Sequence, residues 1–448
     1  MTSLTITGTQ EADFKKKWGE LLSKLTLESA LWEDPDRRTQ VRRMVEEVRR
    51  RGDEAVAEFT ASFDKVDLKP GDFRVDLAVM EKAHRGLDKR LWKALGRSIE
   101  NVRRYQQAIK LEGPADWMAD GVRLGIRYRP LRRVGVCVPG ASAPLVSTVI
   151  MTVAPAQVAG VEEIAVISAA KPEFDNHIHP AVLGVCWELG VTEVYRISGA
   201  QGVAALAFGT KQIKKVDKIV GPGGWWGQLA KKEVYGQVDI DSFAGPSEVL
   251  ILADDSANAA WVAADMLSQA EHAPGSAVLL TDSMRLAQAV AKQVESQLAP
   301  LGRAEQTRRC VKDYCLAVVT QDMAEAIRLA NEFAAEHVQV HCRDSDRMAE
   351  QVVNAGAIFI GPYTPPATGD YYAGPSHTLP TGGSARFFSG LNVNDFIKHS
   401  SIIHYNEAAL QQAADDINIL AETEGLDGHA RSVSIRSKDK KRPFGAIR

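Results

Sequence analysis

Residues 134–140 read VGVCVPG, an apolar run that ends in a Pro-Gly turn. Such a run is typical of a buried strand, and a segment with helical character, residues 147–159, follows it. The same order of strand, turn and helix then recurs along the chain. The later repeats pair strands with helices at 164–168 and 178–189, at 194–197 and up to 207, and at 219–220 and 225–235. This repetition predicts a parallel sheet with right-handed crossover connections.

A second series of the same kind begins at Glu248. Its expected strands are 249–252, 278–281, 317–320, 337–341 and 357–360, with helices between them. The predicted fold class is therefore α/β, with two Rossmann-like parallel-sheet domains. Residues 244–246, which read AGP, mark the boundary between the two series.

Helical patterns dominate the chain before Pro130, at 37–52, 54–63, 79–87 and 91–108. We expect these helices to pack on the second sheet. One α/β domain would then comprise residues 31–131 and 247–388, and the other residues 132–246. The remaining 389–448 form a small C-terminal tail domain, with helices expected near 393–399 and 407–424.

Apolar residues also recur at helical spacing near the start of the chain, at positions 14, 18, 21, 22 and 25. This pattern indicates an amphipathic helix. It fits either a helix packed on its own core or an N-terminal helical arm over residues 1–30 that docks on another subunit.

The composition excludes several classes of protein. The 448 residues carry a net charge of -3, which gives no reason to expect nucleic acid or an anionic membrane as a partner. No run of about 18 apolar residues exists, so no membrane partner is expected. The five cysteines have no CxxC spacing, and an odd number of them fits reduced thiols in a cytoplasmic protein.

Three glycine-containing turns follow strands of the first series, at 139–140, 199–201 and 221–224. Phosphate groups bind at such turns, where a helix begins at the carboxyl end of a strand. None of them matches the GxGxxG pattern, and each alone is equally explained as a tight turn between a strand and a helix. Their recurrence on neighbouring strands favours a nucleotide crevice.

Gln269 and His272 lie at the end of the helical run that starts at Ala259. Residues three apart project from one face of a helix. Together with Asp370, in a loop after a strand, and His429, past the last helix, they make a nitrogen and oxygen set suited to Zn²⁺. The chain has ten histidines, so spacing alone also fits ordinary surface residues.

Glu336 and His337 open the apolar strand 338–340. A carboxylate beside an imidazole is a candidate acid/base pair near neutral pH. Adjacent residues of a strand point to opposite faces, so a solvated pair without a catalytic role is the alternative.

Six stretches together resemble the histidinol dehydrogenase family. They follow the family's order between about Arg132 and Val433. The stretches are AGPSE at 244–248, LSQAEH at 267–272, NEFAAEH at 331–337, GDY at 369–371, SHTLPT at 376–381 and EGLDGH at 424–429.

The resemblance implies an NAD- and zinc-dependent enzyme that oxidises L-histidinol to L-histidine through an enzyme-held aldehyde, the last step of histidine biosynthesis. It implies a homodimer with swapped parts and one zinc ion per subunit. By this resemblance, Gln269, His272 and Asp370 of one subunit and His429 of the other bind zinc, and Glu336 and His337 match the acid/base pair. The positions that match substrate contacts are Ser247, Gln269, His272, His337, Asp370, His377, Glu424 and His429.

The cofactor positions of the family map to Cys137, Gln201 and Gly224. Family members usually have tyrosine at the first of these positions and asparagine at the third, so this chain departs at two of them. A paralogue that oxidises another small polar alcohol, such as a sulfonated diol, stays open, as does a zinc hydrolase or a binding protein that has lost its cofactor. Glu424 favours histidinol, because an anionic side chain repels a sulfonate.

Overall fold

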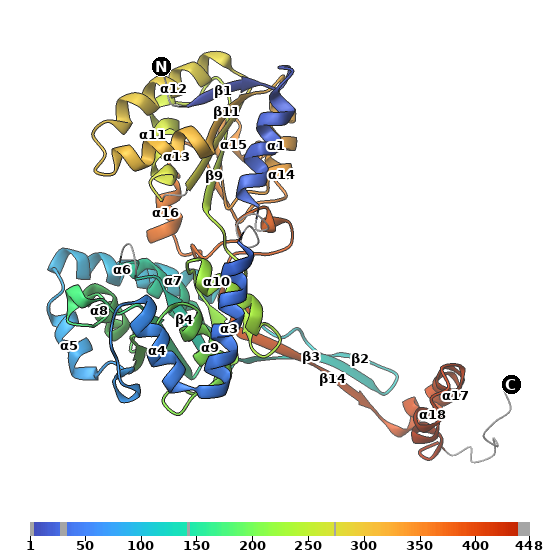
Figure 1. Cartoon of the computed structure of the whole chain (residues 1–448). Coiled ribbons are helices and arrows are strands. Elements are labelled where there is room, and N and C mark those ends of the chain that lie inside the picture. Colours follow the sequence, from blue (N-terminus) through green and yellow to red (C-terminus); the bar gives the residue numbers. More distant parts are fainter. Residues whose placement is uncertain (1–3, 27–33, 141–143, 273–274, 438–448) are drawn as a thin grey trace. The chain divides into compact units, whose positions relative to one another are not determined.

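Two parallel sheets and one antiparallel sheet make up the β-structure of the described residues (Figure 1). The computed structural model describes residues 4–26, 34–140, 144–272 and 275–437. The chain divides into two compact units. The first comprises the residues up to Ile109 together with Leu131–Phe396, and the second comprises Lys110–Pro130 and the residues from Ile397 onward. The α/β fold class is confirmed, and both parallel sheets belong to the first unit.

The larger sheet, sheet A, has six parallel strands in the order β1-β11-β10-β9-β12-β13. Its strands are β1 (Thr5–Gly8), β9 (Ser247–Ala253), β10 (Gly275–Thr281), β11 (Cys315–Val319), β12 (His337–His341) and β13 (Ala357–Ile360). The last five confirm the expected second series. Strand β1 was not expected, because a four-residue edge strand carries too little pattern to be recognised.

Helices cover both faces of sheet A. They are α1 (Phe14–Leu25), α11 (Ala259–Ala270), α12 (Met284–Leu298), α13 (Ala304–Tyr314), α14 (Met323–Phe333), α15 (Ser345–Ala349) and α16 (Pro366–Tyr371). Helices α11, α12 and α13 share one apolar core with the sheet, and α1 and α14 share the other. The four central strands, β9 to β12, are therefore buried on both faces, as their nearly continuous apolar sequences require, while the edge strands β1 and β13 are partly exposed.

Helix α1 packs on its own chain. Phe14, Trp18, Leu21 and Leu25 are buried in the core beneath sheet A, and the Trp18 ring lies 5.8 Å from that of Phe333. The expected arm over residues 1–30 is thus wrong for residues 4–25, while 1–3 and 27–30 lie outside the described residues. An amphipathic pattern shows that a face is buried, but it does not identify the surface that buries it.

The second parallel sheet, sheet B, has the order β6-β5-β4-β7-β8. Its strands are β4 (Arg133–Val138), β5 (Glu163–Ser168), β6 (Glu193–Tyr195), β7 (Lys218–Val220) and β8 (Asp239–Ile240). The chain adds strands on one side of β4 and then returns to the other side with β7. In such sheets, ligands bind at the carboxyl ends of the strands at the point where the direction reverses.

Eight helices of the described residues accompany sheet B. They are α3 (Pro35–Arg51), α4 (Asp53–Phe63), α5 (Leu77–Arg85), α6 (Lys89–Ile109), α7 (Val146–Ala159), α8 (Pro180–Glu188), α9 (Gly199–Phe208) and α10 (Trp225–Val234). Helix α3 contacts α9 and α10, α5 contacts α8, and α6 contacts α7. The helices before Pro130 were expected on the other sheet, and this expectation is wrong. Their apolar faces show that these helices are buried, but the pattern does not identify the sheet that buries them.

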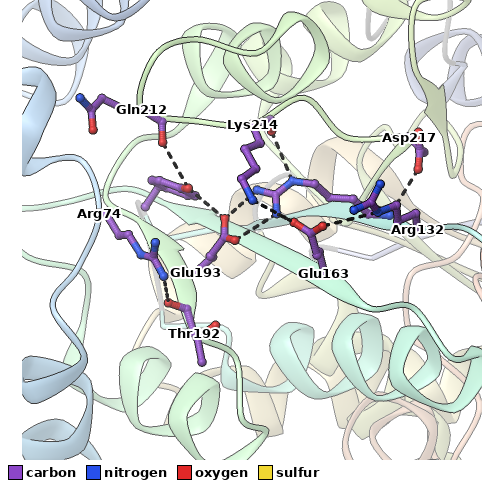
Figure 2. A network of polar contacts seen from close by, with 10 residues as sticks. Arg74, Arg132, Glu163, Thr192, Glu193, Gln212, Lys214 and Asp217 are labelled. Atoms are coloured by element: carbon purple, nitrogen blue, oxygen red, sulfur yellow. Dashed lines mark hydrogen bonds and ion pairs between the residues drawn. The ribbon is translucent and has the colours of Figure 1, made fainter.

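A network of ion pairs ties together the amino ends of the strands of sheet B (Figure 2). The guanidinium of Arg133, which is 5% exposed, lies 2.7 Å from Oε2 of Glu163 and 2.6 Å from Oε2 of Glu193. The hydroxyl of Tyr195 donates to the same oxygen of Glu193 at 3.0 Å. The hydrogen bond from Arg133 lowers the pKa of Glu193. This edge is occupied by structural contacts, which leaves the carboxyl edge for a ligand.

The second unit is an antiparallel ribbon followed by two helices (Figure 1). Its elements are β2 (Trp117–Ala119), β3 (Val122–Pro130), β14 (Ile397–Tyr405), α17 (Glu407–Thr423) and α18 (Asp427–Ser434). Strand β14 pairs with β3 from Ile397 to Tyr405. The helix expected near 393–399 is therefore wrong beyond its first turn, because pairing with a strand distant in sequence overrides the local pattern. The tail domain also takes in residues 110–130, which the sequence had assigned elsewhere.

The remaining helical segments are single 3-10 turns. They are η1 (Pro70–Asp72), η2 (Pro172–Phe174), η3 (Ser384–Arg386) and η4 (Val393–Phe396). Across the part of the chain that the structure describes, no helix has the length and apolar character needed to cross a membrane.

Candidate active site and cofactor crevice

Polar side chains gather at the amino ends of β9 and β12 in sheet A. Ser247 is the first residue of β9, His337 is the first of β12, and the register places His337 beside Val249. The hydroxyl of Ser247 donates to Oε2 of Glu336 at 2.7 Å, and the backbone N–H of Glu248 donates to the same oxygen at 3.0 Å. The Glu336 carboxylate is thus held by two donors from the neighbouring strand.

The imidazole of His337 lies between two carboxylates. Its Nδ1 is 3.6 Å from Oε2 of Glu336 and 3.0 Å from the carbonyl oxygen of Glu248, and its Nε2 is 3.6 Å from Oδ1 of Asp370. Burial lowers the pKa of His337, but the Glu336 and Asp370 carboxylates outweigh burial and raise it to about 9. Burial also raises the pKa of Glu336. The solvated alternative for this pair is wrong, because Glu336 is 6% and His337 is 3% exposed.

Asp370 lies on α16 at the centre of three histidines. The pKa of Asp370 is raised by burial but lowered overall by His337, His377 and His272. His377 reaches the same place from the loop after α16, where its Nδ1 lies 3.1 Å from the backbone oxygen of Asp370. The structure therefore brings together residues from β12, α16, the loop after it and the end of α11.

Gln269 and His272 do not share a helix face as the spacing suggested. Helix α11 ends at Ala270 with Glu271 as its C-cap, so His272 lies just beyond the helix. The N–H of His272 bonds to the carbonyl oxygen of Gln269 at 3.2 Å, which keeps the two residues together. Gln269 is 3% exposed, whereas His272 is exposed. The end of the helix therefore offers one buried amide and one accessible imidazole.

The buried side-chain amide of Gln269 has an unpaired atom, which fits a site that binds a zinc ion and a substrate. Nε2 of Gln269 is buried and has no hydrogen-bond partner among the described residues. Such an atom costs about 1–3 kcal/mol. As a donor it cannot bind a cation itself, but it can donate to a bound substrate, and a 180° turn of the amide puts the carbonyl oxygen, a possible zinc ligand, in the same place. Within the described ranges, no group of three or more His, Cys, Asp and Glu side chains is arranged to hold a metal. Of the predicted ligands, only His272 and Asp370 are of these types in the first unit, because Gln269 is an amide and His429 belongs to the second unit.

Glu424 and His429 belong to the second compact unit. Glu424 caps α17, His429 lies on α18, and both side chains are exposed. The cluster in the first unit therefore contains Ser247, Gln269, His272, Glu336, His337, Asp370 and His377 of the predicted residues.

Two residues of this cluster were missed by the sequence. The carboxyl of Glu248 accepts the backbone N–H of Gly382 at 3.0 Å, and it is 1% exposed. The hydroxyl of Thr148 on α7 lies 3.1 Å from Nε2 of His377. Glu248 could have been found, because it belongs to the AGPSE stretch that carries the family resemblance. Thr148 lies in an apolar helix, and no sequence pattern marks it as a site residue.

The three glycine turns converge on one cavity of about 390 Å³ at the carboxyl edge of sheet B. Cys137, Gln201 and Gly224 all line it, so the crevice expected from the sequence is present. Asp64, at the end of α4, lines it as well and accepts hydrogen bonds from Ser198 at 3.1 Å and Gln201 at 3.3 Å. The cavity lies between the ends of β4 and β7, where the strand order reverses.

The third turn is built around Gly221, whose φ of +106° requires glycine. A Cβ atom there would lie 2.3 Å from the carbonyl oxygen of Cys137. At Gly224, by contrast, a Cβ atom would meet nothing within 4 Å. Burial raises the pKa of the Cys137 thiol to about 12, so this side chain lines the cavity as a neutral group.

The comparisons with known proteins agree on one family. A family model described as histidinol dehydrogenase matches residues 30–437. A histidinol dehydrogenase of Heliobacterium mobile is 46% identical over 411 residues, which cover 92% of this chain and 96% of that protein. One of Bacillus subtilis is 43% identical over 404 residues, covering 90% and 94%. The crystal structure of histidinol dehydrogenase from Elizabethkingia anophelis matches with a TM-score of 0.90 at 31% identity, covering 97% of this chain and 98% of that one. The chain therefore belongs to the histidinol dehydrogenase family.

Proposed function

We propose that this oxidoreductase converts L-histidinol to L-histidine in two successive oxidations that use zinc and NAD⁺. The observation that supports the proposal most is the buried Glu336–His337 pair, which faces Asp370 at one end of sheet A. A carboxylate and an imidazole in direct contact provide the two proton acceptors that the two oxidations need.

The chemistry requires an anchored substrate. Oxidation of an alcohol to an acid removes two hydrides, so the substrate must stay in place while one cofactor replaces another. When bound, zinc provides a fixed point for the imidazole and amine of the substrate, and NAD⁺ accepts a hydride in each oxidation. Gln269, His272 and Asp370 would hold the ion in the first unit. Ser247 and His377 lie beside them and would contact the substrate.

His337 and Glu336 would divide the proton transfers. In its neutral form, which predominates above the pKa of about 9, His337 accepts the proton of the alcohol in the first oxidation. The accepting atom is Nε2, which faces Asp370 and has no hydrogen-bond partner among the described residues. Glu336 then accepts a proton from the water that adds to the aldehyde carbon. Each transfer of this kind is worth about 10²–10⁴ in rate.

The cavity in sheet B would hold the dinucleotide. Support comes from its position at the reversal of strand order and from the glycine turns that line it. Gln201 keeps the amide that the family resemblance leads us to expect at its position. At Cys137 and Gly224 the larger side chains usual in the family are absent, so backbone groups would make the contacts with the dinucleotide there.

The second unit would complete the site of another copy of the chain. Glu424 and His429 are exposed, as are the apolar residues around them, with Leu420 65%, Leu426 42% and Ile435 71% exposed. Exposed apolar side chains of this size are expected where a partner subunit covers them. A homodimer with shared sites follows, as does a cytoplasmic location, since all five cysteines are unpaired.

One assay tests the proposal. The purified protein is supplied with zinc, NAD⁺ and L-histidinol, and the absorbance of NADH is followed. Two NADH for each histidinol consumed, with histidine as the product, are expected. NADH only with other alcohols would show a paralogous dehydrogenase, and no NADH with any alcohol would show a hydrolase or a binding protein. For the shared site, inactive His272→Ala and His429→Ala variants are mixed, and activity is expected to return.

A further inference from the structure

Glu248 and Glu336 are linked by reciprocal hydrogen bonds between β9 and the start of β12. The N–H of Glu248 donates to Oε2 of Glu336 at 3.0 Å, and the N–H of Glu336 donates to Oε2 of Glu248 at 3.4 Å. Each residue therefore holds the side chain of the other with its own backbone.

A third segment joins this pair. The N–H of Gly382 donates to Oε1 of Glu248 at 3.0 Å, so both oxygens of the Glu248 carboxyl accept backbone N–H groups. Gly382 lies in the segment that follows His377 and Leu379. Glu248 thus connects the acid/base residue on β12 to the loop that supplies a predicted substrate contact.

The two carboxyl groups differ in their electrostatic partners. Glu336 has the Ser247 hydroxyl at 2.7 Å and His337 at 3.6 Å. Glu248 is 1% exposed, and among the described residues it has no ion-pair partner. Two neighbouring buried carboxyls cannot both ionise without a large cost, so the one without a cation retains its proton. Burial and the Glu336 carboxylate raise the pKa of Glu248 to about 8, against the opposing effects of the Gly382 and Glu336 N–H groups and of His337.

We propose that Glu248 is a positioning residue for Glu336: as an uncharged carboxylic acid it fixes the Glu336 backbone and the loop after His377, so that the Glu336 carboxylate keeps its charge and its orientation toward water. This inference rests on the role proposed for Glu336 in the oxidation of the aldehyde.

The titratable groups that act on Glu248 are Glu336 and His337, both at the start of β12. Two further neighbours of Glu248 are uncharged. Ser276 is its neighbour in register on β10, and Gly382 is its partner in the loop. Ionisation of Glu248 would therefore place a second negative charge directly beside Glu336.

Two half-reactions separate this role from general stability. Reduction of L-histidinal by NADH reports on the alcohol step, and its oxidation by NAD⁺ reports on the acid step. Glu248→Ala removes the acceptor and is expected to slow the acid step at least about tenfold more than the alcohol step, within the range of one misplaced proton transfer. Glu248→Gln is uncharged and has nearly the same shape, but it keeps only one of the two acceptor oxygens, so it is expected to recover part of this loss. Equal slowing of both steps, or no recovery with glutamine, would overturn the proposal.

Ser276→Ala is the matched control. Ser276 is buried and pairs with Glu248 in the sheet, but its hydroxyl donates to the backbone oxygen of Tyr314 at 2.8 Å. This variant is expected to leave the ratio of the two half-reactions unchanged, and a changed ratio would count against a specific role for Glu248.

A spectroscopic readout does not depend on the substrate. Infrared spectra of the metal-free protein at pH 7 are expected to contain the C=O band of a protonated carboxyl group that disappears in Glu248→Gln. If the band is absent from the unmodified protein, Glu248 is ionised and the proposal fails, even where histidinol is oxidised. If the band is present but histidinol is not oxidised, the proposed function fails while the protonation state of Glu248 stands.

Discussion

The Nζ atom of Lys231 lies 2.6 Å from Oδ1 of Asp241, and both side chains are nearly fully buried. Together they hold the backbone of Gly221. Lys231 donates to its carbonyl oxygen at 2.5 Å, and Oδ2 of Asp241 accepts its N–H at 2.6 Å. A buried ion pair is expensive to desolvate, so its presence beneath the third glycine turn indicates that this turn needs a fixed geometry.

Replacement of Lys231 by methionine should weaken both the fold and the crevice. The variant leaves Asp241 buried without a cation, a change that typically costs about 3–5 kcal/mol. We expect a lower Tm and a higher KM for NAD⁺, measured by thermal unfolding and by steady-state kinetics. Lys232→Met removes the same charge one residue along α10 and serves as the control. A Lys231→Met protein with unchanged Tm and unchanged KM would show that the pair does not support the turn.

Two glycines of the same turn should respond in opposite ways. Gly221→Ala places a Cβ atom 2.3 Å from the oxygen of Cys137 at a φ of +106°, so it should distort the turn and abolish binding of NAD⁺. Gly224→Asn meets nothing within 4 Å and restores the residue type expected from the family resemblance. We expect the asparagine variant to fold and to bind NAD⁺ more tightly, as measured by calorimetric titration. Weaker binding by Gly224→Asn would show that the space at this position is itself used.

Gln269 should contribute to metal binding and little to the fold. Its Nε2 has no partner among the described residues, so Gln269→Met removes no hydrogen bond of that atom. We expect zinc content to fall, as measured by mass spectrometry. The metal-free variant should be no less stable than the unmodified protein, because the unpaired amide that costs about 1–3 kcal/mol is gone. Gln297, whose Nε2 donates to Ala260 at 2.9 Å, provides the converse control. Gln297→Met should lose stability and keep its zinc, and full zinc content in Gln269→Met would remove Gln269 from the ligand set.

The Arg133 network should make stability depend on acid pH. The pKa of Glu193 is lowered from 4.5 by Arg133, so its contribution is complete above that value and is lost as the pH falls through the lower folded pKa. We expect Arg133→Met to lower the Tm markedly at pH 7 and to reduce the further fall between pH 5 and pH 3. Arg132→Met, whose side chain is 77% exposed, should behave like the unmodified protein. Equal effects of the two variants would show that the buried position of Arg133 is irrelevant.

Glu336→Gln should separate the two oxidations. The amide keeps an acceptor for the Ser247 hydroxyl and the Glu248 N–H, so the local structure is preserved. It cannot accept a proton from water, and the acid step should therefore slow by about 10²–10⁴ while the alcohol step is far less affected. Single-turnover NADH formation from histidinol and from histidinal measures the two steps. Equal rates of both steps in the variant and in the unmodified protein would remove Glu336 from its proposed role.

Local sequence patterns predicted the two parallel sheets correctly. The apolar runs at 134–138 and 249–252 formed strands β4 and β9, because a strand buried on both faces needs an apolar residue at nearly every position. The glycine turns after β4 and β7 were also predicted from the sequence. At Gly221, a φ of +106° favours glycine over any other residue.

The sequence analysis was wrong where the structure of a segment depends on its contact with a distant part of the chain. The helix from Pro35 to Arg51 was recognised, but its burial against α9 and α10 was not. Residues 397–405 formed a strand because β3 lies beside them, and nothing local in the sequence required that pairing. His272 lies beyond the end of α11, so its position depends on the chain that follows the helix and not on helical spacing.

The sequence by itself therefore determined the central strands of the two parallel sheets, their glycine turns and the buried faces, because those properties depend on the side chains of a few consecutive residues. It also supplied the candidates for the proposed acid/base pair and zinc ligands. Only the tertiary structure decided which surfaces meet, and so which charges act on each other. Glu248 shows the difference: its hydrogen bonds with Glu336 form only because β9 and β12 pair in one register, and the proton that we propose it retains depends on that contact.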